Sequence, residues 1–368
     1  MKFQRVVVKV GTSTLTAGTR RLSERVIVGL AGQLAELVAN GAQVALVSSG
    51  AIAAGREALG FPDLPKFIPA KQMLAATGQP RLMALYERLF GIYDLRVGQI
   101  LLTREDFENR RRYLSARGTL EALLDQGILP VVNENDTVAT EEIRFGDNDR
   151  LSARVAALIE ADLLVLLTDQ EGLYLCDPRQ DPQAPLVSEV PVGPIEEELW
   201  QAAGAPASGL GSGGMASKLQ AADLARHAGA TVVIASGHRP GVLAEVCAGQ
   251  RLGTWFPPVS DRLEARKRYI LAGAGISGTL HIDAGAGEAL HRGGSLLPVG
   301  ITALEGEFDR GDSVRVLSAQ GRELALGLTH YAAADLARLL GHKSGEIETL
   351  LGYTFGDEVI HRNDMVLL

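Results

Sequence analysis

Short hydrophobic runs alternate with longer amphipathic stretches through the first two-thirds of the chain. The runs carry hydrophobic residues at both alternating positions, as strands do when both faces of their sheet are covered. Alternating strands and helices predict right-handed crossovers and an α/β fold in which helices sandwich a mostly parallel central sheet. The predicted strands are Arg5–Val10, Ala42–Ser48, Val97–Leu102, Ile128–Asn133, Leu163–Thr168 and Thr231–Ala235.

The segment between the first two strands has the pattern of an amphipathic helix. Ser23 is placed to cap its start and Gly41 to end it. The hydrophobic positions that share one face of this helix are Val26, Leu30, Leu34, Leu37 and Val38.

The pattern changes near "FPPVSDRLEARKRY", where two prolines and a charged run precede a tail of short strands and turns. The chain has 368 residues, and a single core usually stops growing at about 250–300 residues, so we expect two domains. The predicted division is a domain at 1–258, a linker at 259–275 and a small β-rich domain at 276–368.

Charge and cysteine content restrict the class of protein. The formal net charge of −8 argues against nucleic acid or an anionic membrane as the default partner. The two cysteines, Cys176 and Cys247, show no metal-ligand spacing, as expected in a reducing compartment. No hydrophobic run of about 18 residues occurs. We therefore expect a cytoplasmic protein without a membrane segment.

Neither common nucleotide signature is present in the required context. A dinucleotide fingerprint GxGxxG needs a strand before it and a helix after it. The match at 209–214 has no strand before it, and the match at 273–278 leads into another strand. The pattern GxxxxGK[ST] does not occur.

A glycine-rich segment at 209–214 precedes a predicted helix that contains Lys218. Glycines let the backbone approach a polyphosphate closely, and a helix N-terminus offers free N–H groups. Lys218 lies about one turn into the helix, where its ammonium could reach a phosphate oxygen. A flexible surface loop explains this segment almost equally well when it is considered alone.

Polar residues gather where several predicted strands end. Lys9 lies near the end of the first strand, and an interior strand does not bury a lysine without an anionic partner. Because open α/β sheets bind ligands at the carboxyl ends of their strands, these clusters indicate a ligand site. The clusters at the other strand ends hold Ser48, Ser49 and Gly50; Asn133, Asn135, Asp136, Asp147, Asn148 and Asp149; and Thr168 and Asp169.

The residue types favour transfer of a phosphoryl group. No histidine occurs before His227, and there is no GxSxG nucleophile motif. Lysines and glycine loops suit phosphoryl transfer, which depends on charge neutralisation and alignment. A carboxylate acceptor is already ionised at neutral pH and needs no general base, although Asp149 could serve a hydroxyl acceptor.

Six segments in this order resemble the bacterial glutamate 5-kinase family of the amino acid kinase superfamily: "VVKVGTSTLT", "VSSGAIAAG", "VVNENDTVAT", "GDNDRLSA", "LLTDQEGLY" and "GLGSGGMASKLQAA". The tail segment "SLLPVGITALEGEFDRGDSVRV" resembles a PUA domain, which is characteristic of this kinase family. The resemblance covers nearly the whole chain. It implies ATP-dependent phosphorylation of the glutamate side-chain carboxylate to glutamyl 5-phosphate, the first step of proline biosynthesis.

The resemblance also implies roles for individual residues. Lys9 and Lys218 would neutralise charge on the transferring phosphoryl group, and Asp149 would organise these lysines. Those implied to hold glutamate are Ser49, Asp136 and Asn148, with Asn133 and Gly50 close by. In this scheme Asp136 accepts from the substrate ammonium and Asn148 donates its amide to a carboxylate. Those implied to hold ATP are Lys9, Thr168, Asp169, Ser212, Gly213, Gly214, Met215, Ala216, Ser217 and Lys218.

No side chain is expected to ligate a metal, because Mg²⁺ would be held mainly by the phosphates of the nucleotide. The resemblance further implies inhibition by proline and assembly into a homo-oligomer, a dimer or a tetramer.

Two other interpretations remain open. The same fold could phosphorylate another acceptor, such as acetylglutamate or aspartate. The tail could instead bind RNA, but residues 276–368 hold 7 Lys and Arg against 13 Asp and Glu, a net charge of 7 − 13 = −6. Nucleic-acid domains usually carry the opposite sign, so nucleic acid is an unlikely partner.

Overall fold

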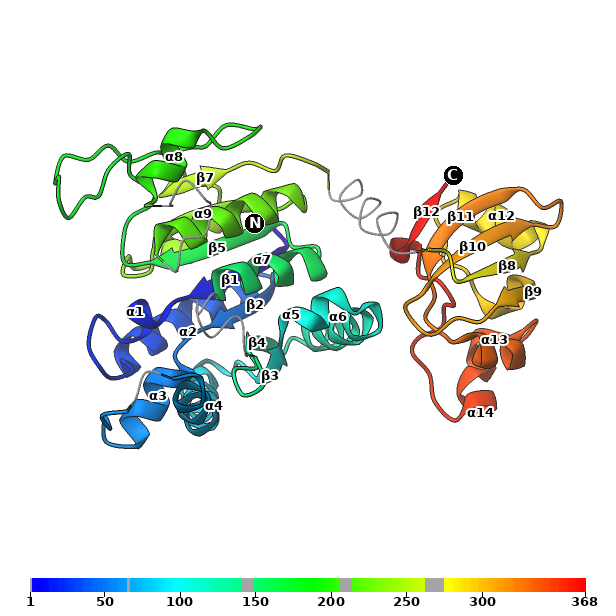
Figure 1. Ribbon diagram of the computed structural model, residues 1–368, viewed down its shortest axis with the longest axis horizontal. Coiled ribbons are helices and arrows are strands. Elements are labelled where there is room, and N and C mark those ends of the chain that lie inside the picture. The colour runs from blue at the N-terminus through cyan, green and yellow to red at the C-terminus, as the bar shows by residue number, and fades with distance from the viewer. Residues whose placement is uncertain (1, 65–66, 140–147, 205–213, 262–274) are drawn as a thin grey trace. The chain divides into compact units, whose positions relative to one another are not determined.

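The computed structural model describes residues 2–64, 67–139, 148–204, 214–261 and 275–368. It divides into two compact units, Met1–Glu105 with Arg117–Arg262 and Asp106–Ala116 with Leu263–Leu368. Figure 1 shows the ribbon coloured along the chain.

A seven-stranded sheet forms the centre of the N-terminal unit, in the order β3-β4-β2-β1-β5-β6-β7. Its strands run parallel except for β7, which pairs antiparallel to β6. The prediction of a mostly parallel sheet is therefore confirmed. The strands are β1 (Arg5–Val10), β2 (Gln43–Ser48), β3 (Val97–Leu102), β4 (Leu129–Glu134), β5 (Leu163–Thr168), β6 (Thr231–Ser236) and β7 (Thr254–Phe256).

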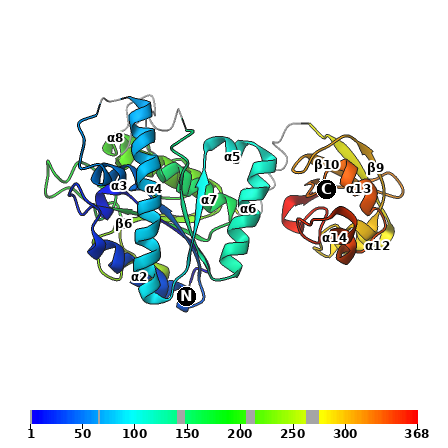
Figure 2. The ribbon, with the colours of Figure 1, turned by 90° about the horizontal axis from the view of Figure 1, so that it is seen from below.

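Helices cover both faces of this sheet (Figures 1 and 2). Residues of α2, α4 and α10 share one hydrophobic core with β1, whereas α7 and α9 pack against each other and against β1 and β6. The helices are α1 (Thr12–Leu15), α2 (Glu24–Ala39), α3 (Ala51–Ala58), α4 (Ile68–Phe90), α5 (Arg104–Glu108), α6 (Arg110–Asp125), α7 (Asn148–Leu158), α8 (Glu197–Ala202), α9 (Met215–His227) and α10 (Val242–Cys247), with a short 3-10 helix, η1 (Gly91–Tyr93).

Strand β1 shows how the sequence pattern divides side chains between the two layers. Successive residues of a strand point to opposite faces of the sheet. Val6, Val8 and Val10 belong to the core shared with α2 and α4. Lys9 alternates with them and therefore points to the face that α7 covers.

Helices α3 and α4 pack side by side at backbone distance, and Figure 2 shows α4 lying lengthwise across the unit. Two glycines make this contact possible. A Cβ on Gly55 would lie 1.9 Å from the carbonyl oxygen of Leu74, and one on Gly78 would lie 1.8 Å from that of Ala51. No side chain fits at either position, so α3 and α4 behave as one rigid pair.

The C-terminal unit holds a five-stranded sheet in the order β12-β11-β10-β8-β9. Its core is formed by hydrophobic residues that include Leu280, Val316, Tyr331 and Ile360. The strands are β8 (Gly278–Ile282), β9 (Ile301–Gly306), β10 (Ser313–Ser318), β11 (Glu323–Leu328) and β12 (Met365–Leu367). The helices are α12 (Ala284–His291), η3 (Pro298–Gly300), α13 (Ala333–Leu339), η4 (Ser344–Glu346), α14 (Ile347–Leu351) and η5 (Arg362–Asp364).

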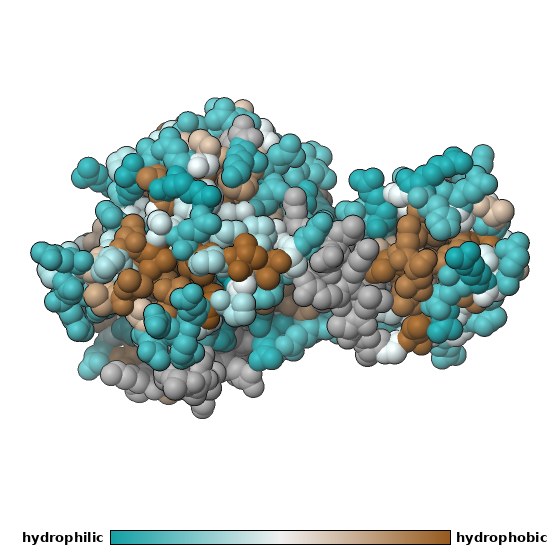
Figure 3. All heavy atoms as spheres, turned by 90° about the horizontal axis from the view of Figure 1, so that it is seen from above, coloured by the Kyte–Doolittle hydropathy of each residue, from teal (hydrophilic) through white to brown (hydrophobic). Residues whose placement is uncertain are grey.

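The surface of the N-terminal unit is not uniformly polar. Figure 3 shows hydrophobic side chains gathered in the middle of one face of this unit, with hydrophilic ones around them. In the part of the chain that the structure describes, no helix combines the length and the apolar character needed to cross a membrane.

Candidate active site

Two lysines from distant segments meet one buried carboxylate at the carboxyl edge of the sheet. The Lys9 ammonium on β1 lies 2.6 Å from Oδ1 of Asp149, which belongs to the first turn of α7. The Lys218 ammonium on α9 lies 3.3 Å from the other carboxylate oxygen, Oδ2. The side chains of Lys9 and Asp149 are only 6% and 5% exposed, so each charge depends on the other for compensation.

The local electrostatics keep Asp149 ionised. Burial alone would raise the pKa of this carboxyl, but the attraction of Lys9 and Lys218 and the hydrogen bonds from Lys9 and Ser217 lower the pKa below its usual value. Its place in the first turn of α7 acts in the same direction, because a helix N-terminus favours negative charge. The lowered pKa keeps Asp149 ionised at neutral pH, where its carboxylate orients two cations.

The start of α9 completes this cluster. The Ser217 hydroxyl donates to Oδ2 of Asp149 at 2.6 Å. The Lys218 ammonium also donates to the carbonyl oxygen of Gly214 at 3.3 Å. Gly214 precedes the helix with φ 84° and ψ −151°, a conformation that favours glycine. Met215 and Ala216 supply the first N–H groups of α9, which point out of the helix end without intrahelical acceptors.

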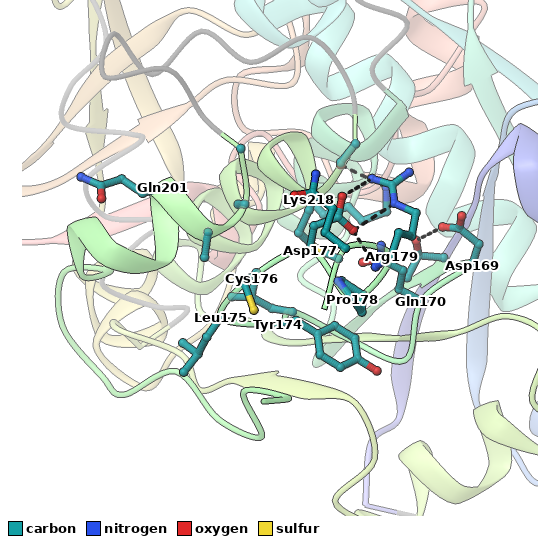
Figure 4. A pocket seen from close by; sticks show the side chains of 18 of the residues that line it. Asp169, Gln170, Tyr174, Leu175, Cys176, Asp177, Pro178, Arg179, Gln201 and Lys218 are labelled. Carbon is teal, nitrogen blue, oxygen red and sulfur yellow. Dashed lines mark hydrogen bonds and ion pairs between the residues drawn. The ribbon is translucent and has the colours of Figure 1, made fainter. Parts of the chain in front are cut away.

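A polar cavity of about 890 Å³ adjoins this cluster (Figure 4). Gly11, Thr168, Asp169, Gly214 and Lys218 line it, which brings together the ends of β1 and β5 with the start of α9. The volume falls within the range of pockets that hold small molecules and cofactors. The remaining predicted nucleotide residues, Ser212 and Gly213, lie outside the described residues, as do the glycines at 209 and 211.

The segment after β5 supplies part of the cavity wall that the sequence did not single out. The Arg179 guanidinium donates two hydrogen bonds of 3.0 Å to the Asp177 carboxylate, and both residues line the cavity (Figure 4). The Thr168 hydroxyl donates to Oδ1 of Asp169 at 3.0 Å. The sequence pattern had indicated only Thr168 and Asp169 in this segment.

A second group of predicted residues meets at the ends of β2 and β4, next to Asp149. The Asn148 side-chain amide lies 3.0 Å from the carbonyl oxygen of Ser48, 3.0 Å from Oγ of Ser49 and 2.9 Å from Oδ1 of Asn133. Asn133 is 3% and Asn148 8% exposed. The buried side chains of Asn133 and Asn148 and the half-buried side chain of Ser49 therefore form one polar cluster.

The side-chain amide of Asn148 does not face the way that the resemblance implied, with its NH₂ group toward a substrate carboxylate. A backbone carbonyl can only accept a hydrogen bond, so the atom of Asn148 that faces the Ser48 carbonyl must be the NH₂ group. That group is engaged by protein oxygens and is not left to donate to a substrate carboxylate. Oδ1 of Asn148 is buried and has no hydrogen-bond partner among the residues that the structure describes. The atom that remains for a ligand is an acceptor.

Two further predicted residues, Gly50 and Asp136, follow Ser49 and Asn133 closely in the sequence. Gly50 precedes α3 with φ 109°, a conformation that residues with a side chain rarely adopt. Asp136 follows β4. Burial raises the pKa of its carboxyl to about 6, and attraction from Lys71 on α4 opposes this shift. Asp136 thus changes charge close to neutral pH.

Two residues on α4 reach this cluster and were not expected from the sequence. Gln79 accepts from Nδ2 of Asn133 at 2.9 Å, and the Tyr86 hydroxyl lies 2.5 Å from Oγ of Ser48. The sequence feature that could have indicated them is a glutamine and a tyrosine seven positions apart, on the buried side of a long helix. Among the described residues, no group of three or more His, Cys, Asp and Glu is arranged to hold a metal ion.

Comparisons with known proteins agree with this architecture. Residues 4–236 match the model of the amino acid kinase family, and residues 278–351 match that of the PUA domain. A glutamate 5-kinase from Shewanella amazonensis is 54% identical over 367 residues, covering 100% of this chain and 96% of its own. One from Shewanella sediminis is 52% identical over 367 residues, with 100% and 98% covered.

Among solved structures, that of UMP kinase from Bacillus anthracis aligns with 71% of this chain and 98% of its own, at 15% identity and a TM-score of 0.48. The family-model matches and the full-length relatives at more than half identity together establish the family. The chain belongs to the amino acid kinase family and, within it, to the glutamate 5-kinases, kinases that carry a C-terminal PUA domain.

Proposed function

We propose that the protein transfers the γ-phosphoryl group of ATP to the side-chain carboxylate of L-glutamate and forms L-glutamyl 5-phosphate. The observation that carries this proposal is the arrangement of Lys9 and Lys218 about Asp149 at the sheet edge. This group of three charges lies between a nucleotide-sized cavity and the polar cluster formed by Ser49, Asn133 and Asn148. The names of the full-length relatives support the choice of glutamate.

The reaction needs an aligned acceptor and compensation of negative charge. A glutamate carboxylate oxygen attacks the γ-phosphorus, a new O–P bond forms, and the bond to the bridging oxygen breaks, leaving its electron pair on ADP. The ammonium groups of Lys9 and Lys218 stabilise the charge that spreads over the phosphoryl oxygens. No proton has to be removed because the acceptor is a carboxylate, which fits a cluster without histidine.

In this proposal ATP occupies the cavity beside Thr168 and Asp169, with its phosphates toward the start of α9. Residues 212–218 contribute backbone N–H groups and the Lys218 ammonium to the phosphates. The polar lining and the Lys218 ammonium that borders the cavity suit a polyphosphate. Mg²⁺, bound mainly to phosphate oxygens, would neutralise charge and hold the phosphates in one geometry.

Glutamate lies on the other side of Asp149 in this proposal, beside Ser49, Gly50, Asn133, Asp136 and Asn148. Ionised Asp136 attracts the substrate ammonium, while the helix N-terminus that follows Gly50 suits a carboxylate. Proline inhibits by competing for the same cluster, since it carries the same ammonium and α-carboxylate charges.

The wider setting is part of the same proposal. The catalytic domain spans 1–258 and the PUA domain 276–368, joined by a linker at 259–275. The enzyme acts in the cytoplasm in the first step of proline biosynthesis, and both cysteines are free. The hydrophobic face in Figure 3 supports a homo-oligomer, because exposed hydrophobic surface of this kind favours association.

Turnover with a panel of acceptors tests the proposal. ADP release is measured with glutamate, acetylglutamate and aspartate, with and without proline, and the acyl phosphate is trapped with hydroxylamine as the hydroxamate. We expect hydroxamate only with glutamate, and less of it when proline is present. Absence of glutamate-dependent ADP release would contradict the proposal. Turnover with only another acceptor would mean that the protein is a kinase with a different substrate.

A further inference from the structure

Ser49, Asn133 and Asn148 are called the acceptor cluster, and a chain of side-chain amides connects helix α4 to Asn148 in it. Asn148 donates to Oδ1 of Asn133 at 2.9 Å, and Asn133 donates to Oε1 of Gln79 at 2.9 Å. Gln79 then donates to Oε1 of Gln99 on β3 at 3.2 Å. Gln79 is 9% exposed, and its hydrogen bond with Asn133 is buried, where it is stronger than in water. Its other partner, Gln99, is exposed.

The direction of this chain is fixed by backbone groups. The backbone N–H of Glu134 donates to Oδ1 of Asn133 at 2.9 Å, and an N–H group cannot accept. The oxygen of Asn133 must therefore lie on that side, and its NH₂ group must face Gln79. Flipping Gln79 would place two NH₂ groups against each other. The backbone thus fixes which way the Asn133 amide faces, and Gln79, as the acceptor of its NH₂ group, anchors Asn133 beside Asn148.

A second arm reaches Asn148 from the same helix. The Tyr86 hydroxyl lies 2.5 Å from Oγ of Ser48, and the Ser48 hydroxyl donates to the carbonyl oxygen of Ser49 at 2.8 Å. Because Ser48 has one hydroxyl hydrogen, Tyr86 is the donor in their contact. This arm fixes the Ser48–Ser49 segment, whose backbone carbonyl and side-chain hydroxyl both contact the Asn148 amide.

Both arms start from one rigid surface. Gln79 and Tyr86 are seven residues apart on α4 and therefore lie on the same face of the helix. Gly78, beside Gln79, holds α4 against α3 at backbone distance, and α3 begins directly after Gly50. Helix α4 thus supports the acceptor cluster through backbone contacts and through two buried side chains.

We infer that Gln79 and Tyr86 are positioning residues for the amino-acid acceptor. They hold the NH₂ group of Asn148 against protein oxygens, so that its buried Oδ1, which has no partner among the described residues, accepts from the ammonium group of the substrate. This inference rests on the proposed function. Neither residue touches the phosphoryl group, so their effect falls on the affinity for the acceptor and not on ATP.

The test compares Gln79→Met and Tyr86→Phe with wild type. Met keeps the length of the side chain without the amide, and Phe keeps the ring that packs on Phe90 with a centroid distance of 5.1 Å. We expect the KM for glutamate to rise about tenfold in Gln79→Met and severalfold in Tyr86→Phe, as loss of one buried hydrogen bond predicts. The KM for ATP should stay within about twofold of wild type.

Glutarate, which has both carboxylates of glutamate but no ammonium, provides the second measurement. Its Ki as a competitor of glutamate should be the same in Gln79→Met and wild type, because the affected contact is absent. Gln43→Met is the matched control. Its amide also bridges two side chains, accepting from Arg5 and donating to Asp125, but it lies at the opposite end of β2. Its KM for glutamate should not change.

The outcomes separate this inference from the proposed function. Glutamate turnover by wild type with an unchanged KM in both variants overturns the inference alone. The same holds if glutarate and glutamate weaken equally, or if kcat falls while both KM values stay constant, as partial unfolding would produce. Wild type that does not phosphorylate glutamate overturns both. If Gln79→Met fails to fold, Tyr86→Phe decides, since it removes one oxygen atom.

Discussion

Lys9 and Lys218 come from different segments but contact the same carboxylate, that of Asp149, and both are proposed to act on the phosphoryl group. If both stabilise charge on the phosphoryl group in flight, Lys9→Ala or Lys218→Ala should lower kcat by about 10²–10³, far more than either raises KM. ADP release at saturating ATP and glutamate measures this. Lys2→Ala, which removes an exposed lysine of the same unit, is the control. An unchanged kcat in either active-site variant contradicts the assigned role.

Asp136 gives the acceptor site a pH dependence of its own. Burial raises the pKa of this carboxyl to about 6, so the carboxylate is ionised above that pH and largely protonated below it. A neutral carboxyl attracts an ammonium less strongly, so the KM for glutamate should rise about tenfold for each pH unit below about 6.

Initial rates across this pH range provide the measurement. Asp136→Asn should have a high KM at neutral pH and no such rise on acidification, because its side chain does not titrate. A wild-type KM that stays flat through pH 6, or the same acid-dependent rise in Asp136→Asn, would assign the dependence to another group.

At the scale of elements, the pairing of α3 and α4 determines where the acceptor cluster lies. In Gly78→Ala the added Cβ would meet the Ala51 carbonyl oxygen at 1.8 Å, so the helices must separate. Overpacking of this kind costs about 1–3 kcal/mol in unfolding free energy, and the shift of α4 should also raise the KM for glutamate. Denaturant unfolding and initial rates measure the two effects.

The control for this substitution is Gly29→Ala in α2. A Cβ at Gly29 meets nothing within 4 Å, and alanine is the better helix former by about 1 kcal/mol, so this variant should be slightly more stable than wild type. If Gly78→Ala is as stable as Gly29→Ala and has the wild-type KM, the close contact does not hold the site in place.

The sequence predicted the elements of the sheet well, because buried parallel strands leave a strong local pattern. Arg5–Val10 and Leu163–Thr168 have the predicted bounds, and the second predicted strand starts one residue later, at Gln43. Ser23 caps α2 by accepting from the backbone N–H of Val26 at 3.4 Å. The buried face of α2 includes Ile27 and Ala31, which the pattern did not place there. Val26 and Val38, which it did, are only half-buried.

The residue pattern predicted only those parts of the site in which residues lie at or just after the ends of strands. Lys9 needed an anion because a buried strand cannot hold an isolated ammonium, and Asp149 supplies it. The orientation of Asn148 and the roles proposed for Gln79 and Tyr86 could not be foreseen. They depend on hydrogen bonds between residues as far as 100 positions apart, and nothing in the local sequence encodes which amide atom faces which partner.

At the scale of the whole molecule, the chain joins an α/β kinase unit to a PUA domain, and residues 276–368, which contain that domain, carry a net charge of −6. Binding to a nucleic-acid backbone draws most of its free energy from lysine and arginine contacts with phosphates. A domain with nearly twice as many acidic as basic residues lacks this contribution and should instead be repelled by RNA. We expect the intact protein to leave tRNA unshifted in a gel at low salt, where electrostatic attraction is strongest.

The salt series decides what any observed shift means. Phosphate contacts weaken steeply as salt rises, with a slope in log K against log salt of about −0.9 for each phosphate neutralised on a duplex. A shift that disappears between about 50 and 200 mM salt would therefore reveal a basic surface that the net charge conceals, and would contradict the prediction. A shift that persists through the series would point to stacking or hydrogen-bond contacts and would equally refute it. Absence of binding at every salt concentration is the expected result, and added tRNA should then change neither the KM for glutamate nor kcat.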